Sequence, residues 1–121
     1  MTLIEAVRAA IQSAMRSDPD VFVIGEDIGK RGGVFLATQG LLDEFGEGRV
    51  IDAPLAEACI AGIALGAAMD GRRPIAEIQF ADFMWPAINQ LVGEAARVRY
   101  GTKGKLNAPM VVRCSYGGPV R

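Results

Sequence analysis

Residues 49–71 read RVIDAPLAEACIAGIALGAAMDG and join a short extended segment to a strongly apolar helix. The twelve residues between Glu57 and Asp70 contain no charge, amide or hydroxyl group. Pro54 favours a helix start, and Gly71 followed by Pro74 favours a stop, so the pattern predicts a helix over about 56–69. The most distinctive feature of the sequence is therefore a single carboxylate at the start of an apolar helix.

The flanking segments alternate between helical and extended patterns. Thr2 and Glu5 have capping-box spacing ahead of a helix that Pro19 ends. Three strands are predicted at 21–25, 75–80 and 110–114, with a brief extended piece at 49–53 and a short helix at 35–45 that Gly46 stops. Pro86 begins another helix, whose expected buried face is Ile88, Leu91, Val92, Ala95 and Val98, with Glu94, Arg97 and Arg99 facing outward. The alternation predicts an α/β fold with a mainly parallel sheet.

Composition narrows the class of protein. The chain has 121 residues and a formal charge of −1, and half of its residues are hydrophobic, which predicts one globular unit with no basic surface for nucleic acid or membrane lipid. The apolar run is too short to span a bilayer, and no signal peptide is evident, so we expect a cytosolic protein. Cys59 and Cys114 are expected to be reduced core thiols. Because the chain lacks histidine, acid–base chemistry must use carboxylates.

Small residues make the 56–69 helix unusual. Gly62 and Gly66 lie four residues apart among alanines, so the backbone can approach another helix closely. That helix could belong to the same domain or to a partner subunit, and the sequence leaves both open. The glycine-rich segments at 29–35 and 101–106 do not match nucleotide-binding motifs. Three strands make a narrow sheet, which predicts that the chain is a fragment of a larger domain.

Glu57 has two interpretations from the residues alone. In the first turn of a helix, a carboxylate is stabilised by the dipole and the unpaired N–H groups by about 0.3–1 kcal/mol, which is a plain capping role. Alternatively, a carboxyl group in apolar surroundings requires a specific hydrogen-bond partner, and a ligand with a ring nitrogen would supply one.

Several long motifs carry a family resemblance. The stretch DAPLAEACIAGIALGAAMDGRRPIAEIQFADFMWPAINQLVGEAARVRY, with GEDIGKRGGVF before it and APMVVRCSYGG after it, resembles the β subunit of thiamine-diphosphate-dependent 2-oxo acid dehydrogenases. The branched-chain and pyruvate enzymes are the nearest models. The resemblance implies a transketolase-like fold in which residues 1–121 form the amino-terminal part of the domain that binds the aminopyrimidine ring.

The resemblance also implies site residues. Glu57, in the motif Pro54-Leu55-Ala56-Glu57, would hydrogen-bond a pyrimidine nitrogen and promote the tautomer that makes the reactive ylid. Leu55 would contact the cofactor, and Gln79 and Phe83 would line the pyrimidine pocket. The plain alternatives are a solvent-facing strand residue for Gln79 and a core aromatic for Phe83. The sequence departs from the family pattern at two positions: Ala53 replaces a threonine, and Pro119 replaces a glycine.

Partners and cofactors follow from the same resemblance. The family forms an α2β2 heterotetramer, in which the α subunit holds the diphosphate of thiamine diphosphate through Mg²⁺, and it passes the acyl group to the lipoyl acyltransferase core of a multienzyme complex. Some members bind a structural K⁺ near the segment matching 108–111. The family's histidine motif would follow Arg121, so the chain alone is expected to be inactive. A non-catalytic piece kept for subunit assembly is the alternative. The expected location is the cytoplasm, or the mitochondrial matrix in a eukaryote.

Overall fold

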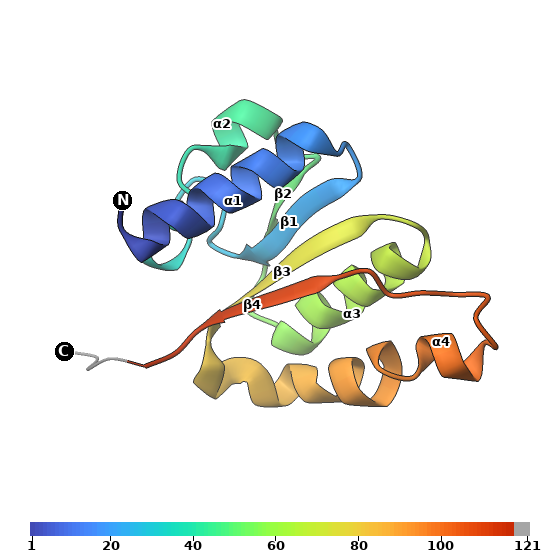
Figure 1. Ribbon diagram of the computed structural model, residues 1–121. Helices are drawn as coiled ribbons and strands as arrows, with labels where there is room; N and C mark the ends of the chain where they lie inside the picture. The colour runs from blue at the N-terminus through green and yellow to red at the C-terminus, as the bar shows by residue number, and fades with distance from the viewer. Residues whose placement is uncertain (118–121) are drawn as a thin grey trace.

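The computed structural model describes residues 1–117 as a four-stranded parallel sheet with helical segments on both faces (Figure 1). The strands lie in the order β2-β1-β3-β4, and their bounds are β1 Val21–Glu26, β2 Val50–Ala53, β3 Arg73–Phe80 and β4 Val111–Ser115. Helices α1 (Leu3–Ser17) and α2 (Leu41–Phe45) cover one face, and α3 (Glu57–Met69) covers the other. The predicted α/β fold with a parallel sheet is confirmed.

Alternate residues of the central strands face two separate cores, as the period of a strand requires. On the α1 face, the buried apolar residues are Ile11, Met15, Val21, Val23, Ile28, Leu41 and Val50. On the α3 face, they are Phe22, Ile24, Ile60, Ala61, Ala64, Ala76, Ile78 and Ala87. Strand β1 contributes to both cores, so it is the structural centre of the molecule.

The helix ends match the sequence signals. The Thr2 hydroxyl accepts a hydrogen bond from the Glu5 N–H at 3.2 Å, and the Thr2 N–H donates to the Glu5 carboxylate at 2.7 Å, which completes the predicted capping box. Helix α3 begins at Glu57 and is followed by Gly71 with φ near +96°, a conformation that favours glycine. The two helices that matter most for the sheet were therefore readable from local sequence.

Two expectations about short elements were wrong. The brief extended piece at 49–53 is the strand β2, which pairs in parallel with β1 so that Val50 is aligned with Val23. The sheet therefore has four strands and not three. The single helix expected at 35–45 is a 3₁₀ turn, Val34–Leu36, followed by α2. Gly40, with φ near +83°, separates them, and Gly46 ends α2 as predicted. Pattern alone could not resolve elements of this length.

The segment after β3 departs most from the prediction. It consists of a 3₁₀ helix η2 (Ala81–Ala87), a π-helix η3 (Asn89–Ala95) and a short α4 (Val98–Gly101). Its expected buried face is only partly right. Leu91 packs against the core of the α3 face, but the Ile88 and Val92 side chains are 37% and 61% exposed. The residues expected to face outward, Glu94, Arg97 and Arg99, are exposed. The Ala96 N–H donates to the Leu91 carbonyl at 2.9 Å, a π-type hydrogen bond, so the 3.6-residue period on which that face was predicted does not apply.

The two cysteines are free, but only one resembles a core residue. Cys114 is half-buried and packs against the core of the α3 face, whereas Cys59 is exposed on the outer side of α3, so its expected burial was wrong. Helix α3 is apolar all round, and periodicity gives no signal for which of its faces is covered. Within residues 1–117 no helix is long and apolar enough to cross a membrane. Pro119 lies outside the described residues.

Candidate functional site

The candidate site lies at the carboxyl edge of the sheet, between β1 and β3. The chain leaves β1 toward β2 and leaves β3 toward β4, so the two connections depart in opposite directions. In open parallel sheets, this arrangement opens a crevice outside the strand ends, where ligands bind. The side chains that reach this edge come from the end of β1, the start of α3 and the end of β3.

Glu57 is the first residue of α3 and is half-buried. The N-cap of this helix is Ala56, which has no side chain that can cap, so the N–H groups of the first turn favour a negative charge here. Within residues 1–117 the Glu57 carboxylate has no hydrogen-bond or ion-pair partner. It is therefore free to accept a hydrogen bond from, or share a proton with, a ligand.

Glu26, at the end of β1, is the second carboxylate of this edge, and sequence reasoning missed it. Burial raises the pKa of Glu26 above its ordinary value, and the nearby negative charges of Asp27 and Glu57 raise it further. Glu26 is aligned with Ala53 at the end of β2, four residues before Glu57, so both acids lie at the same edge of the sheet. The signal in the sequence was an acid directly after a buried strand in an α/β pattern, which is where ligand sites of this fold lie.

The other three predicted residues also lie around the edge. Gln79 is half-buried. Its amide donates a hydrogen bond to the Glu26 backbone carbonyl at 3.4 Å and so links the end of β3 to the end of β1. The Phe83 ring is 46% exposed and meets Phe80 edge-to-face, with 5.9 Å between ring centroids. Leu55 is 74% exposed. An exposed aromatic ring and an exposed leucine beside a free carboxylate form a surface that a flat heterocycle could contact.

A third acid, Glu77, is buried in the middle of β3. It is 1% exposed, its Oε2 accepts a hydrogen bond from Arg113 on β4, and its Oε1 has no partner within the described residues. Burial raises the pKa of Glu77, while the Arg113 guanidinium opposes that shift. A Cβ added to Gly33 would lie 3.2 Å from Glu77 Oε1 and 2.7 Å from the Thr38 hydroxyl, so the glycine lets the 32–37 loop close over the acid.

These residues fit one half of the expected cofactor. A free carboxylate, an amide and an exposed aromatic ring at the strand ends are the groups that an aminopyrimidine ring needs. A diphosphate needs a metal ion or a cluster of cations, and residues 1–117 contain no group of three or more acids, cysteines or histidines that could hold a metal. The groups present at the strand ends are those that suit the pyrimidine end, and the assignments of Leu55, Glu57, Gln79 and Phe83 stay predictions.

Comparison with known proteins agrees with this geometry. Residues 1–121 match the family model described as transketolase, pyrimidine binding domain. The chain is 55% identical over 120 residues to the 2-oxoisovalerate dehydrogenase subunit beta of Bacillus subtilis. It is 46% identical over 120 residues to the pyruvate dehydrogenase E1 component subunit beta of the same organism, and 47% identical to that of Staphylococcus epidermidis. Each alignment covers 99% of this chain and 37% of the relative, so the chain spans little more than a third of their length.

Proposed function

This chain belongs to the transketolase pyrimidine-binding domain family, and from that premise we propose that it is the pyrimidine-binding part of a 2-oxo acid dehydrogenase β subunit. The reaction would be the oxidative decarboxylation of a 2-oxo acid with transfer of the acyl group to lipoyl. The names of the similar proteins support this reaction class, and both branched-chain and pyruvate enzymes are among them.

The observation that carries the proposal is the Glu57 carboxylate, which is half-buried, without a protein partner and close to a second acid. When bound, thiamine diphosphate supplies a thiazolium carbon that loses a proton and then attacks the 2-oxo group. Glu57 would hold a proton against a pyrimidine ring nitrogen. A ligand that covers Glu57 would exclude water, and a hydrogen bond is stronger in such surroundings.

The neighbouring residues would position Glu57 and the ring. Gln79 fixes the end of β1 through its bond to the Glu26 carbonyl, so the two strand ends hold a constant separation. Phe83 would contact one side of the ring, and its contact with Phe80 holds the aromatic group in place. Leu55 would exclude water from the hydrogen bond at Glu57.

The remaining parts of the enzyme would come from elsewhere. We propose an α2β2 assembly in which an α subunit holds Mg²⁺ and the diphosphate; the names of the similar proteins, which are beta subunits, support a second type of subunit. Delivery of the acyl group to a lipoyl acyltransferase core, a structural K⁺ near residues 108–111 and a cytoplasmic location belong to the same proposal.

Replacement of Glu57 by glutamine in the complete enzyme tests this assignment. Glutamine keeps the shape of the side chain and cannot exchange a proton, so exchange of the thiazolium C–H with D₂O should slow by about 10²–10⁴-fold, the usual contribution of a positioned acid or base. Cofactor affinity and melting temperature should be recorded beside the exchange rate. Asp43→Asn is the matched control, because Asp43 is also a first-turn acid, in α2.

The two interpretations of Glu57 separate cleanly in this experiment. If Glu57 only stabilises the start of α3, its glutamine variant loses about 0.3–1 kcal/mol of stability, as Asp43→Asn should, and exchanges at the wild-type rate. A folded, cofactor-loaded Glu57→Gln enzyme with wild-type exchange would refute the catalytic assignment.

A further inference from the structure

The 32–37 loop, which includes the 3₁₀ turn Val34–Leu36, has an unfavourable backbone conformation. Phe35 and Leu36 are consecutive residues with large side chains, and their φ angles are near +55° and +60°. This left-handed region disfavours residues that have a Cβ, and they normally adopt it one at a time. The two side chains are 62% and 47% exposed, so their own burial does not compensate for the strain. Backbone strain of this kind persists only where the surrounding structure holds it, and it is common near functional sites.

Two side chains from outside the loop hold it in this conformation. The Arg8 guanidinium, on α1, donates two hydrogen bonds to the Leu36 carbonyl, from Nε at 3.0 Å and from one terminal nitrogen at 2.6 Å. Thr38, which directly follows the loop and is fully buried, donates from its hydroxyl to the Ile28 carbonyl at 2.7 Å. The loop is therefore fixed both to α1 and to the residues that follow β1.

The ring of Phe35 is the first of three aromatic rings in contact. It meets the ring of Phe80, which is half-buried at the end of β3, edge-to-face, with 6.3 Å between centroids and 86° between the ring planes. Phe80 meets Phe83 in the same way, at 5.9 Å and 85°. Because aromatic pairs favour this geometry, each ring limits how its neighbour can turn. The row of rings therefore links the strained loop to the residue that is assigned to the pyrimidine pocket.

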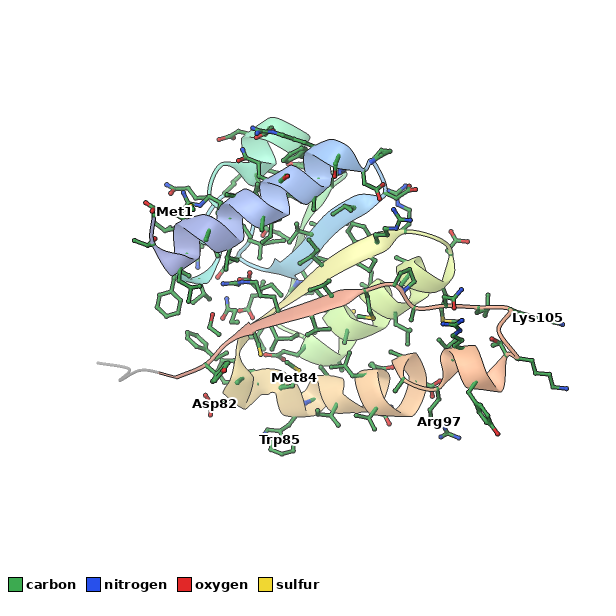
Figure 2. All side chains as sticks on the ribbon, viewed as in Figure 1. Met1, Asp82, Met84, Trp85, Arg97 and Lys105 are labelled. Carbon is green, nitrogen blue, oxygen red and sulfur yellow. The ribbon has the colours of Figure 1, made fainter. Side chains whose placement is uncertain are left out.

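The loop lies where the layers on both faces of the sheet reach its carboxyl edge. In Figure 2, Met1, ahead of α1, and Asp82, in η2, both lie on the side of the view toward which the strand arrows of Figure 1 point. Helix α1 covers one face of the sheet, whereas η2 contributes Ala87 to the core of the α3 face. The loop contacts α1 through the Leu36 carbonyl and the end of β3 through the Phe35 ring. It thus connects a helix on one face with the aromatic residues that lead into the segment on the other.

We propose that Phe35 is a positioning residue for the aminopyrimidine ring of the cofactor: it supports Phe80, which in turn sets the orientation of Phe83. Phe83 is 46% exposed, and the torsion that turns a phenylalanine ring is broad, so this ring needs support to present one fixed face to a ligand. The strained backbone of the 32–37 loop keeps the Phe35 ring against Phe80 although most of that ring is exposed. The inference rests on the proposed function, since it concerns how Phe83 meets the cofactor, and it adds a residue that acts without touching the cofactor.

Calorimetric binding of thiamine diphosphate to the complete enzyme, with any partner subunit coexpressed, tests the proposal. Phe35→Ala should weaken this binding about 3–10-fold, the contribution expected of one aromatic pair, and leave the binding of inorganic pyrophosphate unchanged, because pyrophosphate has no pyrimidine ring. Phe35→Tyr keeps the ring and should bind thiamine diphosphate as the wild type does. Leu36→Ala is the matched control and should also bind like the wild type, since Leu36 has the same strained backbone and takes no part in the row of rings.

A double-mutant cycle shows whether Phe35 acts through Phe83. Phe83→Ala should weaken cofactor binding by itself, and adding Phe35→Ala should then cost less than about twofold, because the ring that it supports is already absent. The proposal is overturned if Phe35→Ala binds thiamine diphosphate as Leu36→Ala does, if it weakens pyrophosphate binding equally, or if the losses of the two single variants multiply. A Phe35→Ala chain that no longer assembles with its partner would also overturn it, since Phe35 would then be a subunit contact.

Failure of this inference can be told apart from failure of the proposed function. If the wild-type enzyme binds pyrophosphate but no thiamine diphosphate, the proposed function is wrong, and the role of Phe35 falls with it. If the wild type and Phe35→Ala bind the cofactor equally well, the proposed function stands and only the role of Phe35 is refuted.

Discussion

Two glutamates of this chain occupy opposite extremes of environment. Glu57, at the head of α3, is half-buried and has no partner among residues 1–117. Glu77, in the middle of β3, is 1% exposed and is paired with Arg113. A free acid at the mouth of a crevice can serve a ligand, whereas a buried acid with a cation on the next strand serves the fold. Glu57 stands out in the sequence because it begins an apolar run, but the fold depends on Glu77, which the sequence does not single out.

The largest effect on stability is expected at the buried pair. Arg113→Met removes the cation and leaves an uncompensated carboxylate beneath the 32–37 loop, which should cost about 3–5 kcal/mol of the free energy of unfolding. Urea denaturation of the complete protein measures this loss. Glu57→Gln, by contrast, should cost no more than about 1 kcal/mol.

The control for this prediction is a pair on the surface. Arg72 lies 3.5 Å from Asp20, and the two side chains are 44% and 50% exposed, so Arg72→Met should change stability by at most about 1 kcal/mol. If Arg113→Met is as mild as Arg72→Met, then Glu77 is not held by its cation and the contrast between the two acids disappears. Replacing Glu77 and Arg113 together by apolar residues should restore much of the loss, because no charge is then left unpaired.

Local sequence predicted the Glu57 region well; it also predicted the strand that carries Glu77, but not the burial of that acid. The run from Pro54 to Gly71 carries its own start signal, stop signal and apolar composition, so α3 and its acid could be placed without tertiary information. Glu77 sits in the alternating run IAEIQF, where the same pattern describes a solvent-facing acid. Only the position of β3 inside the sheet, with Arg113 beside it on β4, reveals that this face is covered.

The other failures have the same origin in tertiary structure. The face of residues 86–98 was predicted from a 3.6-residue period that the 3₁₀ and π windings of this segment do not follow. Cys59 was expected in the core because the two cysteines have no disulfide or metal-site spacing, and a free cysteine is usually buried. Helix α3 is apolar on every side, so its sequence does not distinguish the covered face from the open one. In both cases the sequence showed that the segment is apolar, but it did not show which side chains face the core.

Helix α3 provides a prediction of intermediate size that bears on the Glu57 region. A Cβ at Gly62 would lie 4.0 Å from Gln90 of the same chain, whereas a Cβ at Gly66 meets nothing within 4 Å. Gly62 thus contacts its own domain, whereas Gly66 is exposed and is the glycine at which the proposed partner subunit would pack. Gly66→Leu should weaken assembly by about 1–3 kcal/mol through overpacking. It should also stabilise the helix itself by about 0.5–1 kcal/mol, because glycine is a poor helix former.

Size-exclusion chromatography and a thermal melt of the complete assembly separate these two effects. Gly66→Ala is the matched control, since it brings most of the gain in helix propensity and adds only one methyl group to the exposed side of α3. An assembly that tolerates leucine as well as alanine at this position would show that no subunit packs closely on Gly66. The Glu57 region would then lose its expected partner, although its chemistry could still be tested separately.

The smallest effect expected is a change in the pKa of Glu26 when Glu57 becomes glutamine. Burial of Glu26 is the main reason that its pKa is raised, and the charges of Asp27 and Glu57 follow in that order, so removing the Glu57 charge should lower the pKa without returning it to its ordinary value. Carboxyl chemical shifts followed during an NMR titration measure the change, and Asp43→Asn should leave the Glu26 titration where it was.

The direction of the linked effect on folding can be worked out from the same shift. Because folding raises the pKa of Glu26, its protonated form favours the folded state; this contribution is complete below the ordinary pKa and is lost as the pH rises through the raised one. Stability falls with rising pH between the ordinary pKa of Glu26 and its raised pKa in the folded protein. Because Glu57→Gln lowers the raised pKa, the upper limit of this pH range should move down. An unchanged Glu26 titration would mean that the two carboxyl groups do not sense each other. Glu57 would then stand as an isolated acid, and its proton would have to be controlled by the ligand alone.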